Sequence, residues 1–256
     1  MADIAKTPLS APANYTPLPR TENTMENPDT LTQGHTVRRY DHELAALHGR
    51  LRVMGELVVR QLREAVELGR DLDIARARQL IARDSEVDQL EVAADEAIFE
   101  LIARRCPVGA DLRVVITVSK SVSDLEKIGD EAVRIVSLTL QELADTEGQP
   151  GEMVQPELDR IGNMALARLI DAVGLFERWD EEKALRVIEG YREIDSEFRS
   201  ELRSVMTGII TDGLPISSAV NFVLIAKSFE RIAHHAQNLA EYAIFEIKGV
   251  DMRAEN

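Results

Sequence analysis

The stretch DLRVVITVSKSVSDLEKIGDEAVRIVS, Asp111–Ser137, decides the fold of this chain. Its apolar residues recur at intervals of three and four, the period of an α-helix, and no proline interrupts them. They form one apolar stripe that must be buried against other helices. Glu126 and Asp130 lie one turn apart on the edge of this stripe, and Gly129 beside them would let a partner helix approach closely. Two like charges at this spacing are unfavourable unless a cation neutralises them.

The composition predicts a helical, soluble, cytoplasmic protein. The chain has 256 residues, 45% of them hydrophobic but only 4% aromatic. A net charge of −15 argues against nucleic-acid binding and against direct docking on anionic lipid, so we expect membrane contact only through partners. The single Cys106 excludes an internal disulfide and fits a reducing compartment. No apolar run reaches the about 20 residues of a membrane span, and the proline-rich first residues carry no secretory pattern.

The same periodicity predicts six helices. We expect them at His35–Asp71, Ile74–Arg104, Asp111–Asp145, Glu157–Trp179, Glu181–Ile210 and Ile216–Lys248. Pro107 and Gly109 end the second helix, and the segment TDGLP, which contains Pro215, ends the fifth.

The two halves of the chain resemble each other. SEVDQLE (Ser85–Glu91) matches REIDSEF (Arg192–Phe198), and SDLEKIGDEA (Ser123–Ala132) matches KSFERIAHHA (Lys227–Ala236). A duplication is the simplest origin of this pattern, so we predict an all-α fold of two tandem, pseudo-symmetric three-helix bundles. The predicted segments are a disordered tail 1–34, a first repeat 35–145, a linker 146–156, a second repeat 157–248 and a C-terminal tail 249–256.

The second predicted helix carries a row of acids beside its apolar stripe. Their spacings of four, three and four place them within one narrow arc; they are Asp84, Asp88, Glu91 and Asp95. If this helix packs beside the third, the row meets Glu126 and Asp130 in one groove. Clustered carboxylates without His or Cys suit Mg, Ca, Mn or Fe better than Zn. The sequence therefore predicts a metal site of six carboxylates.

These acids could instead serve either of two simpler roles. They can form a solvated acidic face, which is common, or pair with basic neighbours such as Lys127 and Arg134. Lys127 and Arg134 lie on a different face of the helix from Glu126, which weakens the case for ion pairs. Both roles stay open beside the metal site.

The second half keeps fewer acids. The row is replaced by Tyr191, Asp195, Phe198 and Leu202, and on the last helix Glu230 is retained while His234 stands in place of Asp130. A second site at Asp195, Glu230 and His234 is therefore poorly supplied. His234 and His235 are better interpreted as polar residues at a helix edge.

No motif of a nucleophilic enzyme is present. The chain has no glycine-rich phosphate loop, no G-x-S-x-G and no zinc-protease motif. We therefore predict a non-enzymatic signalling protein. The alternatives are a carboxylate-bridged metalloenzyme, such as a phosphatase or oxidase, using the same acids, and a plain helical scaffold without metal.

Four segments of the chain resemble the PhoU family of phosphate-transport accessory and regulatory proteins. They are HTVRRYDHELAALHGRL, EVDQLEVAADE, RRCPVGADLRVVITVSKSVSDLEKIGDEA and ERIAHHAQNLAE, and the resemblance spans residues 35–248. It implies two three-helix bundles with metal clusters on Glu/Asp-x-x-x-Asp pairs, here Glu91 with Asp95 and Glu126 with Asp130. The chain departs from the family pattern at His234, where Asp is usual, and at Arg134, where Asn is usual.

The resemblance also implies a function. A protein of this family would repress the phosphate-starvation response by bridging the ATPase subunit of a phosphate ABC transporter and a sensor histidine kinase. The bound ion is expected to be Fe, Mn or Mg. Long exposed helix faces make a homodimer the expected assembly.

Overall fold

A computed structural model describes residues 38–146, 155–177, 180–211, 215–250 and 252. The predicted tail 1–34, most of the predicted linker 146–156 and most of the predicted C-terminal tail lie outside these residues. Nothing in the described part tests those predictions.

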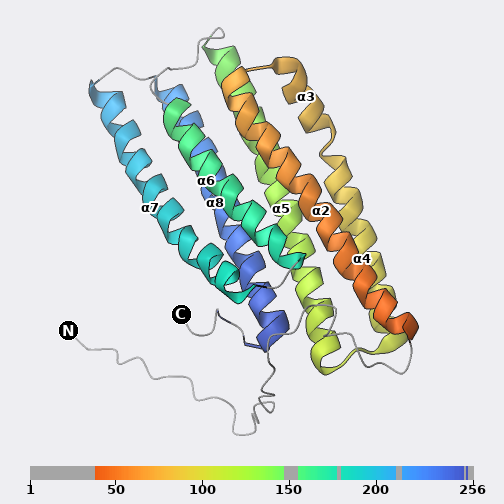
Figure 1. The fold of residues 1–256 in the computed structure, drawn as a ribbon. Coiled ribbons are helices and arrows are strands. Elements are labelled where there is room, and N and C mark those ends of the chain that lie inside the picture. The colour runs from red at the N-terminus through yellow and green to blue at the C-terminus, as the bar shows by residue number, and fades with distance from the viewer. Residues whose placement is uncertain (1–37, 147–154, 178–179, 212–214, 251, 253–256) are drawn as a thin grey trace, which may run out of the picture.

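The described chain is all-helical, as predicted. Its elements are α2 (Arg38–Asp71), α3 (Ile74–Ala82), α4 (Ser85–Arg105), α5 (Gly109–Asp145), α6 (Gln155–Val173), the short 3₁₀ helix η1 (Gly174–Phe176), α7 (Glu181–Thr211) and α8 (Ile216–Lys248). Figure 1 shows two groups of long helices side by side, with α2, α4 and α5 in one and α6, α7 and α8 in the other. The tandem three-helix architecture is therefore confirmed.

One predicted helix is divided in two. The expected helix Ile74–Arg104 is interrupted at Arg83 and Asp84, which separate α3 from α4. Asp84 and Ser85 have short polar side chains that compete with helical hydrogen bonds, and such residues favour helix ends. The apolar period continues across the turn because Leu80 and Val87 are two helical turns apart, so periodicity alone could not reveal it.

Another predicted helix is shorter than expected. The helix predicted for Glu157–Trp179 ends at Val173 and continues as η1. Gly174 follows Val173 directly, and glycine is among the weakest helix formers.

The predicted chain break at Pro107 is confirmed, whereas residues 212–214 of the break predicted at TDGLP lie outside the described residues. Cys106 adopts the left-handed conformation, with φ 48° and ψ 58°, directly before Pro107. Gly249 ends α8 with φ 69°, a conformation that suits glycine. Both helices therefore end where the sequence places a residue that cannot continue them easily.

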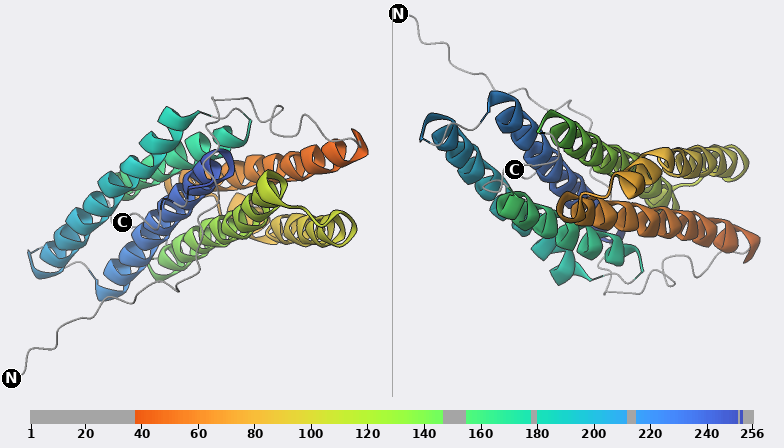
Figure 2. Two further views of the ribbon diagram at one scale, coloured as in Figure 1. Left: turned by 90° about the horizontal axis from the view of Figure 1, so that it is seen from below. Right: turned by 90° about the horizontal axis from the view of Figure 1, so that it is seen from above.

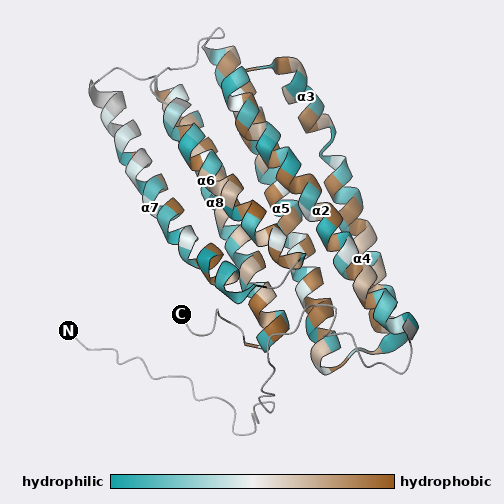
Figure 3. Cartoon of the chain, viewed as in Figure 1, coloured by the Kyte–Doolittle hydropathy of each residue, from teal (hydrophilic) through white to brown (hydrophobic). Residues whose placement is uncertain are grey.

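The core runs through both bundles without a gap. Leu125 and Ile128 of α5 and Ile232 and Leu239 of α8 are each 0% exposed and belong to one apolar cluster. Hydrophobic and hydrophilic stretches alternate along the long helices (Figure 3), and the buried residues are mostly hydrophobic. In Figure 2 both end-on views show α8 beside α5, so these helices join the repeats.

Polar contacts cross the α5–α8 junction in antiparallel register. The Thr117 hydroxyl donates to the Tyr242 carbonyl at 3.3 Å. His235 Nδ1 lies 3.0 Å from Asp124 Oδ1. The Arg231 guanidinium lies 2.8 Å from Glu131 Oε1. Because these acids are nearly buried, their cationic or imidazole partners are needed to offset desolvation.

Within the described residues, no helix has the length and apolarity needed to cross a membrane.

Candidate metal centre

The acid-bearing edges of α4 and α5 lie next to each other, and we call the strip of surface between these edges the furrow. α4 packs against α5, and Val87 of α4 lies against Gly129 of α5. This contact sets the two acid-bearing edges next to each other. The negative charge of Asp130 acts on Asp84 and Glu91 across the furrow, and that of Asp88 acts on Asp130. The structure therefore brings together acids that the sequence placed on two separate helices.

The close approach expected at Gly129 is only partly required. A Cβ added there would lie 3.4 Å from a methyl group of Val87, which is an ordinary contact. The helices approach more tightly at Gly162 of α6, where an added Cβ would lie 2.9 Å from the ring of Phe229.

Crowding raises the pKa of several furrow carboxyls. Burial and then the charges of Asp130, Glu91 and Asp88 raise the pKa of Glu126 to about 7. Burial is also the largest cause of the raised pKa of Asp84, followed by the charges of Asp130 and Asp88. Like charges held together disfavour ionisation, so the furrow carries negative charge that its neighbours do not fully compensate.

Glu126 and Asp130 interact directly with each other. Burial and the charge of Asp88 raise the pKa of Asp130, while a hydrogen bond from Glu126 opposes that rise. A carboxylic acid donating to a carboxylate is the arrangement expected when two carboxyls share one proton. A metal ion bound by both would displace that proton, so its affinity would rise with pH.

The basic neighbours give little compensation. Lys127 Nζ lies 3.8 Å from Asp124 Oδ1, on the side of the α5–α8 junction, and its charge only partly offsets the raised pKa of Glu91 and of Glu126. Arg134 is exposed. Ion pairing therefore accounts for a small part of the charge of the acidic rows.

The donor set fits a hard or borderline cation. Oxygen ligands from carboxylates suit Mg, Mn or Fe, and the uncompensated charge supplies the attraction. Among the residues that the structure describes, no three His, Cys, Asp or Glu side chains converge closely enough to hold an ion as they stand. Binding would therefore require the furrow carboxylates to turn inward, and half-exposed side chains such as Glu91 and Glu126 have room to do so.

The corresponding acids in the second repeat are already engaged. The Tyr191 hydroxyl donates to Glu230 Oε1 at 2.6 Å, and Lys227 donates to the other oxygen of the same carboxylate. Arg199 Nε donates to Asp195 at 3.0 Å, and the exposed His234 ring lies 5.4 Å from the Tyr191 ring. Asp195, Glu230 and His234 therefore lie near one another but share protein partners that a metal would have to displace.

Sequence reasoning missed two polar pairs between the repeats. His235, expected at a helix edge, lies against Asp124. Burial alone would raise the pKa of Asp124, but His235, Tyr242 and Lys127 outweigh burial and lower that pKa. His48 of α2 lies 3.2 Å from the buried Glu246 of α8. No local sequence pattern predicts either pair, because the partners are more than a hundred residues apart in the sequence.

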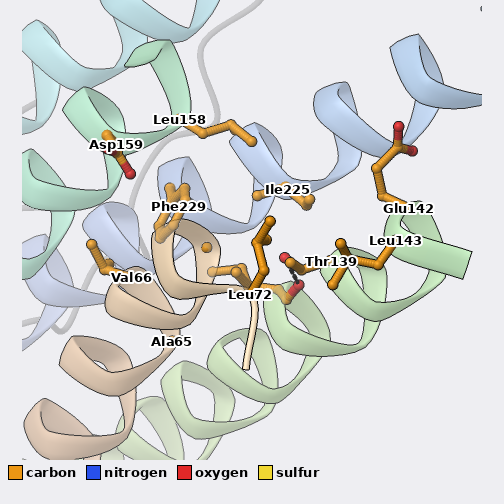
Figure 4. A pocket seen from close by; sticks show the side chains of 12 residues that line it. Ala65, Val66, Leu72, Thr139, Glu142, Leu143, Leu158, Asp159, Ile225 and Phe229 are labelled. Atoms are coloured by element: carbon orange, nitrogen blue, oxygen red, sulfur yellow. Dashed lines mark hydrogen bonds between the residues drawn. The ribbon is translucent and has the colours of Figure 1, made fainter. Parts of the chain in front are cut away.

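An apolar cavity of about 50 Å³ lies apart from the acidic furrow. It is lined by residues of α2, α5, α6 and α8, among them Val66, Ile225 and Phe229. Figure 4 shows these side chains pointing into it, while the Thr139 hydroxyl is tied to the Ile135 carbonyl at 2.9 Å. None of the predicted site residues lines this cavity, and its size suits only a very small molecule.

Comparisons with known proteins agree with the duplicated helical pattern. The sequence model of the PhoU domain matches twice, at residues 51–139 and 158–243. The phosphate-specific transport system accessory protein PhoU homolog of Pseudomonas aeruginosa is 35% identical over 90% of this chain and 93% of its own length. The corresponding Escherichia coli protein is 31% identical over 86% of this chain and 89% of its own length.

Solved structures show the same fold. The crystal structure of PhoU from Pseudomonas aeruginosa superposes with a TM-score of 0.78 at 34% identity, over 82% of this chain and all of that one. The phosphate transport system regulatory protein PhoU from Streptococcus pneumoniae gives a TM-score of 0.75 at 26% identity, over 83% of this chain and 99% of that one.

Proposed function

This chain is a member of the PhoU family, and we propose that it is a regulatory accessory protein of phosphate uptake and not an enzyme. The names of its relatives support the link to phosphate-specific transport. The observation that carries the proposal is the family's domain pattern, which occurs twice in helices that offer long faces to partner proteins.

We propose further that the protein acts as an adaptor in the cytoplasm. It would contact the ATPase subunit of a phosphate ABC transporter and a sensor histidine kinase, and would keep the kinase output low when phosphate is plentiful. The likeness of the sequence to the family supports this role. A homodimer is the expected assembly.

The metal in this proposal is a structural cross-link between α4 and α5. Asp84, Asp88, Glu91 and Asp95 would hold it from one side of the furrow, and Glu126 and Asp130 from the other. When bound, an Fe, Mn or Mg ion would supply positive charge that lets all these carboxyls ionise together. The raised pKa values of Glu126 and Asp130 support this proposal, because they show that burial and neighbouring carboxylates make ionisation unfavourable, and a bound cation would remove that penalty.

The double variant Glu126→Gln with Asp130→Asn tests the site. Loss of two ligands should lower the metal content of protein purified without chelator, with affinity falling on the order of tenfold or more. The same variant should release the phosphate-starvation response in cells grown with abundant phosphate. Elemental analysis and a promoter reporter measure the two effects.

Glu86→Gln serves as the matched control. Glu86 is an exposed acid of α4 on a different face from Asp88, so its loss should leave metal and repression unchanged. Full metal content and full repression in the double variant would refute the site. Hydrolysis of a phosphoester or consumption of O₂ in proportion to bound metal would establish the metalloenzyme alternative instead.

A further inference from the structure

Helix α4 presents apolar residues on two faces, although it packs on only one side. Val87, Ala94, Ile98 and Leu101 are buried against the core formed with α2 and α5. On the outer face Val92 is 57% exposed, Phe99 71% and Ile102 41%. Both end-on views in Figure 2 place α4 at the edge of the molecule, where nothing in the described chain covers this face. Three large apolar side chains at helical spacing on an open face are typical of a binding surface.

A hollow lies beside Phe99 on this face. It measures about 480 Å³ and lies between α2 and α4, lined by Arg50, Ala93, Glu96, Ala97, Phe99 and Glu100. A convex aromatic ring next to a hollow offers both an anchor and a socket to an incoming helix.

The charges around the apolar stripe are mainly negative, although Arg50 lines the hollow and Arg104 pairs with Glu100 at 2.6 Å. Between Glu86 and Glu100, α4 carries six acidic residues and no basic one. At 100° per residue, Glu96 falls beyond Val92 on one side of the stripe and Glu91 falls beyond Ile102 on the other, while Asp88 and Asp95 fall between Phe99 and Ile102. The stripe is therefore bordered by carboxylates on both sides.

We propose that Val92, Phe99 and Ile102 form a docking surface for an amphipathic helix of a protein partner, with Lys or Arg residues flanking the partner's apolar stripe. Burial of the apolar side chains would provide affinity, and the flanking carboxylates would select a basic partner over a neutral or acidic one.

The same charges argue against a second copy of the chain or its own first residues as the occupant. A second copy that met this face with its own α4 would bring six acids against six, and like charges across an interface are strongly unfavourable. The expected homodimer must therefore use another face. Residues 1–37 of this chain carry two basic and four acidic side chains, so they do not complement the surface either.

This inference deepens the proposed adaptor role by giving it a surface, and it rests on that role only in requiring a protein partner. Glu96 lies outside the furrow and would keep its charge with an ion bound, whereas Asp88, Glu91 and Asp95 are also proposed metal ligands, so the peptide titration is done on metal-free protein.

Titration of the full-length protein with defined peptides tests the proposal. The probe is a fluorescent 18-residue helix of leucine and lysine with the leucines at helical spacing. Phe99→Ser should weaken its binding by about tenfold or more, since a central aromatic anchor carries much of the affinity of such interfaces. Ile216→Ser, which removes an equally exposed apolar residue on α8, should change the affinity less than twofold.

Two comparison peptides complete the test, together with a measurement of the protein's mass in solution, which reports whether it is a dimer. A scrambled peptide of the same composition should bind more weakly than the amphipathic one, and a leucine–glutamate helix should not bind. Equal loss in both variants, equal binding of the scrambled peptide, or a dimer that Phe99→Ser dissociates would overturn the proposal. Peptide binding and phosphate repression are measured separately, so failure of one does not count against the other.

Discussion

One of several replacements in the second acidic site also engages the glutamate that remains there. Tyr191 occupies the position that corresponds to Asp84, and its hydroxyl donates to Glu230, the counterpart of Glu126. Glu230 is 4% exposed, whereas Glu126 is half-buried in the furrow. Replacing a carboxyl by a phenol thus turns a potential ligand into the acceptor of a buried hydrogen bond, and the repeat loses its open cluster.

Removal of that hydroxyl should destabilise the protein. Tyr191→Phe leaves the buried Glu230 carboxylate with Lys227 as its remaining partner, and loss of a hydrogen bond to a buried charge costs about 1–3 kcal/mol. Urea unfolding measures the difference. In a double-mutant cycle, Tyr191→Phe should cost much less when Glu230→Gln is already present. Independent, additive effects would show that the two side chains do not interact.

At this scale the sequence predicted which residues carry charge but not all of their partners. The furrow acids follow from helical spacing because each row lies on one helix. Asp124 and His235 lie on helices from different repeats, and their contact depends on the register between α5 and α8. Register is a property of packing, which no local pattern contains.

At the scale of elements, the long helices follow from periodicity and the breaks follow from local chemistry. Pro107 and Gly109 marked the end of α4 correctly. The turn at Arg83 and Asp84 carries neither proline nor glycine, and the apolar period runs through it. It is held by tertiary contacts as well, since Arg83 forms a 2.6 Å ion pair with Glu64 of α2.

Three glycine variants should rank the helix contacts by tightness. Gly162→Ala places a Cβ 2.9 Å from the buried Phe229 ring and 3.2 Å from Val66, so overpacking should cost about 1–3 kcal/mol. Gly129→Ala meets only ordinary contacts and should gain up to about 1 kcal/mol from helix propensity. Thermal and urea unfolding measure both.

Gly49→Ala calibrates this series. An added Cβ at Gly49 has no neighbour within 4 Å, so its effect reports propensity alone. If Gly162→Ala were as stable as Gly49→Ala, the conclusion that α6 packs tightly against α8 at Gly162 would be wrong.

At the scale of the whole molecule, the first and last long helices meet at a contact between a histidine and a buried carboxyl group. His48 of α2 lies 3.2 Å from Glu246 of α8, whose side chain is fully buried. Burial alone would lower the pKa of His48, but the hydrogen bond and charge of Glu246 outweigh it and raise the pKa. Protonated His48 therefore ties the first repeat to the second.

This pair makes stability depend on pH. A histidine with a raised pKa in the folded protein contributes fully below its unfolded pKa of about 6.5 and loses that contribution as pH rises through the folded value. The free energy of unfolding should therefore fall as the pH rises above about 6.5, and His48→Gln should flatten the fall. Urea titrations at a series of pH values measure it. The exposed His42→Gln is the control, and an unchanged pH slope in His48→Gln would contradict the assignment.

The residues that meet between α5 and α8 occupy equivalent positions in the two repeats. In the alignment that pairs Glu126 with Glu230 and Asp130 with His234, His235 corresponds to Glu131 and Ser228 to Asp124. Exchanging the repeats in this alignment therefore turns the pair Asp124–His235 into the pair Ser228 with Glu131. Two identical chains can close an interface of this kind, because each residue meets its exchanged counterpart. A single repeat could therefore complete its core by pairing with a second, identical repeat. Once two repeats are joined in one polypeptide, they can diverge: the first repeat keeps its acids, and the second has Tyr191 and His234 in place of two of them.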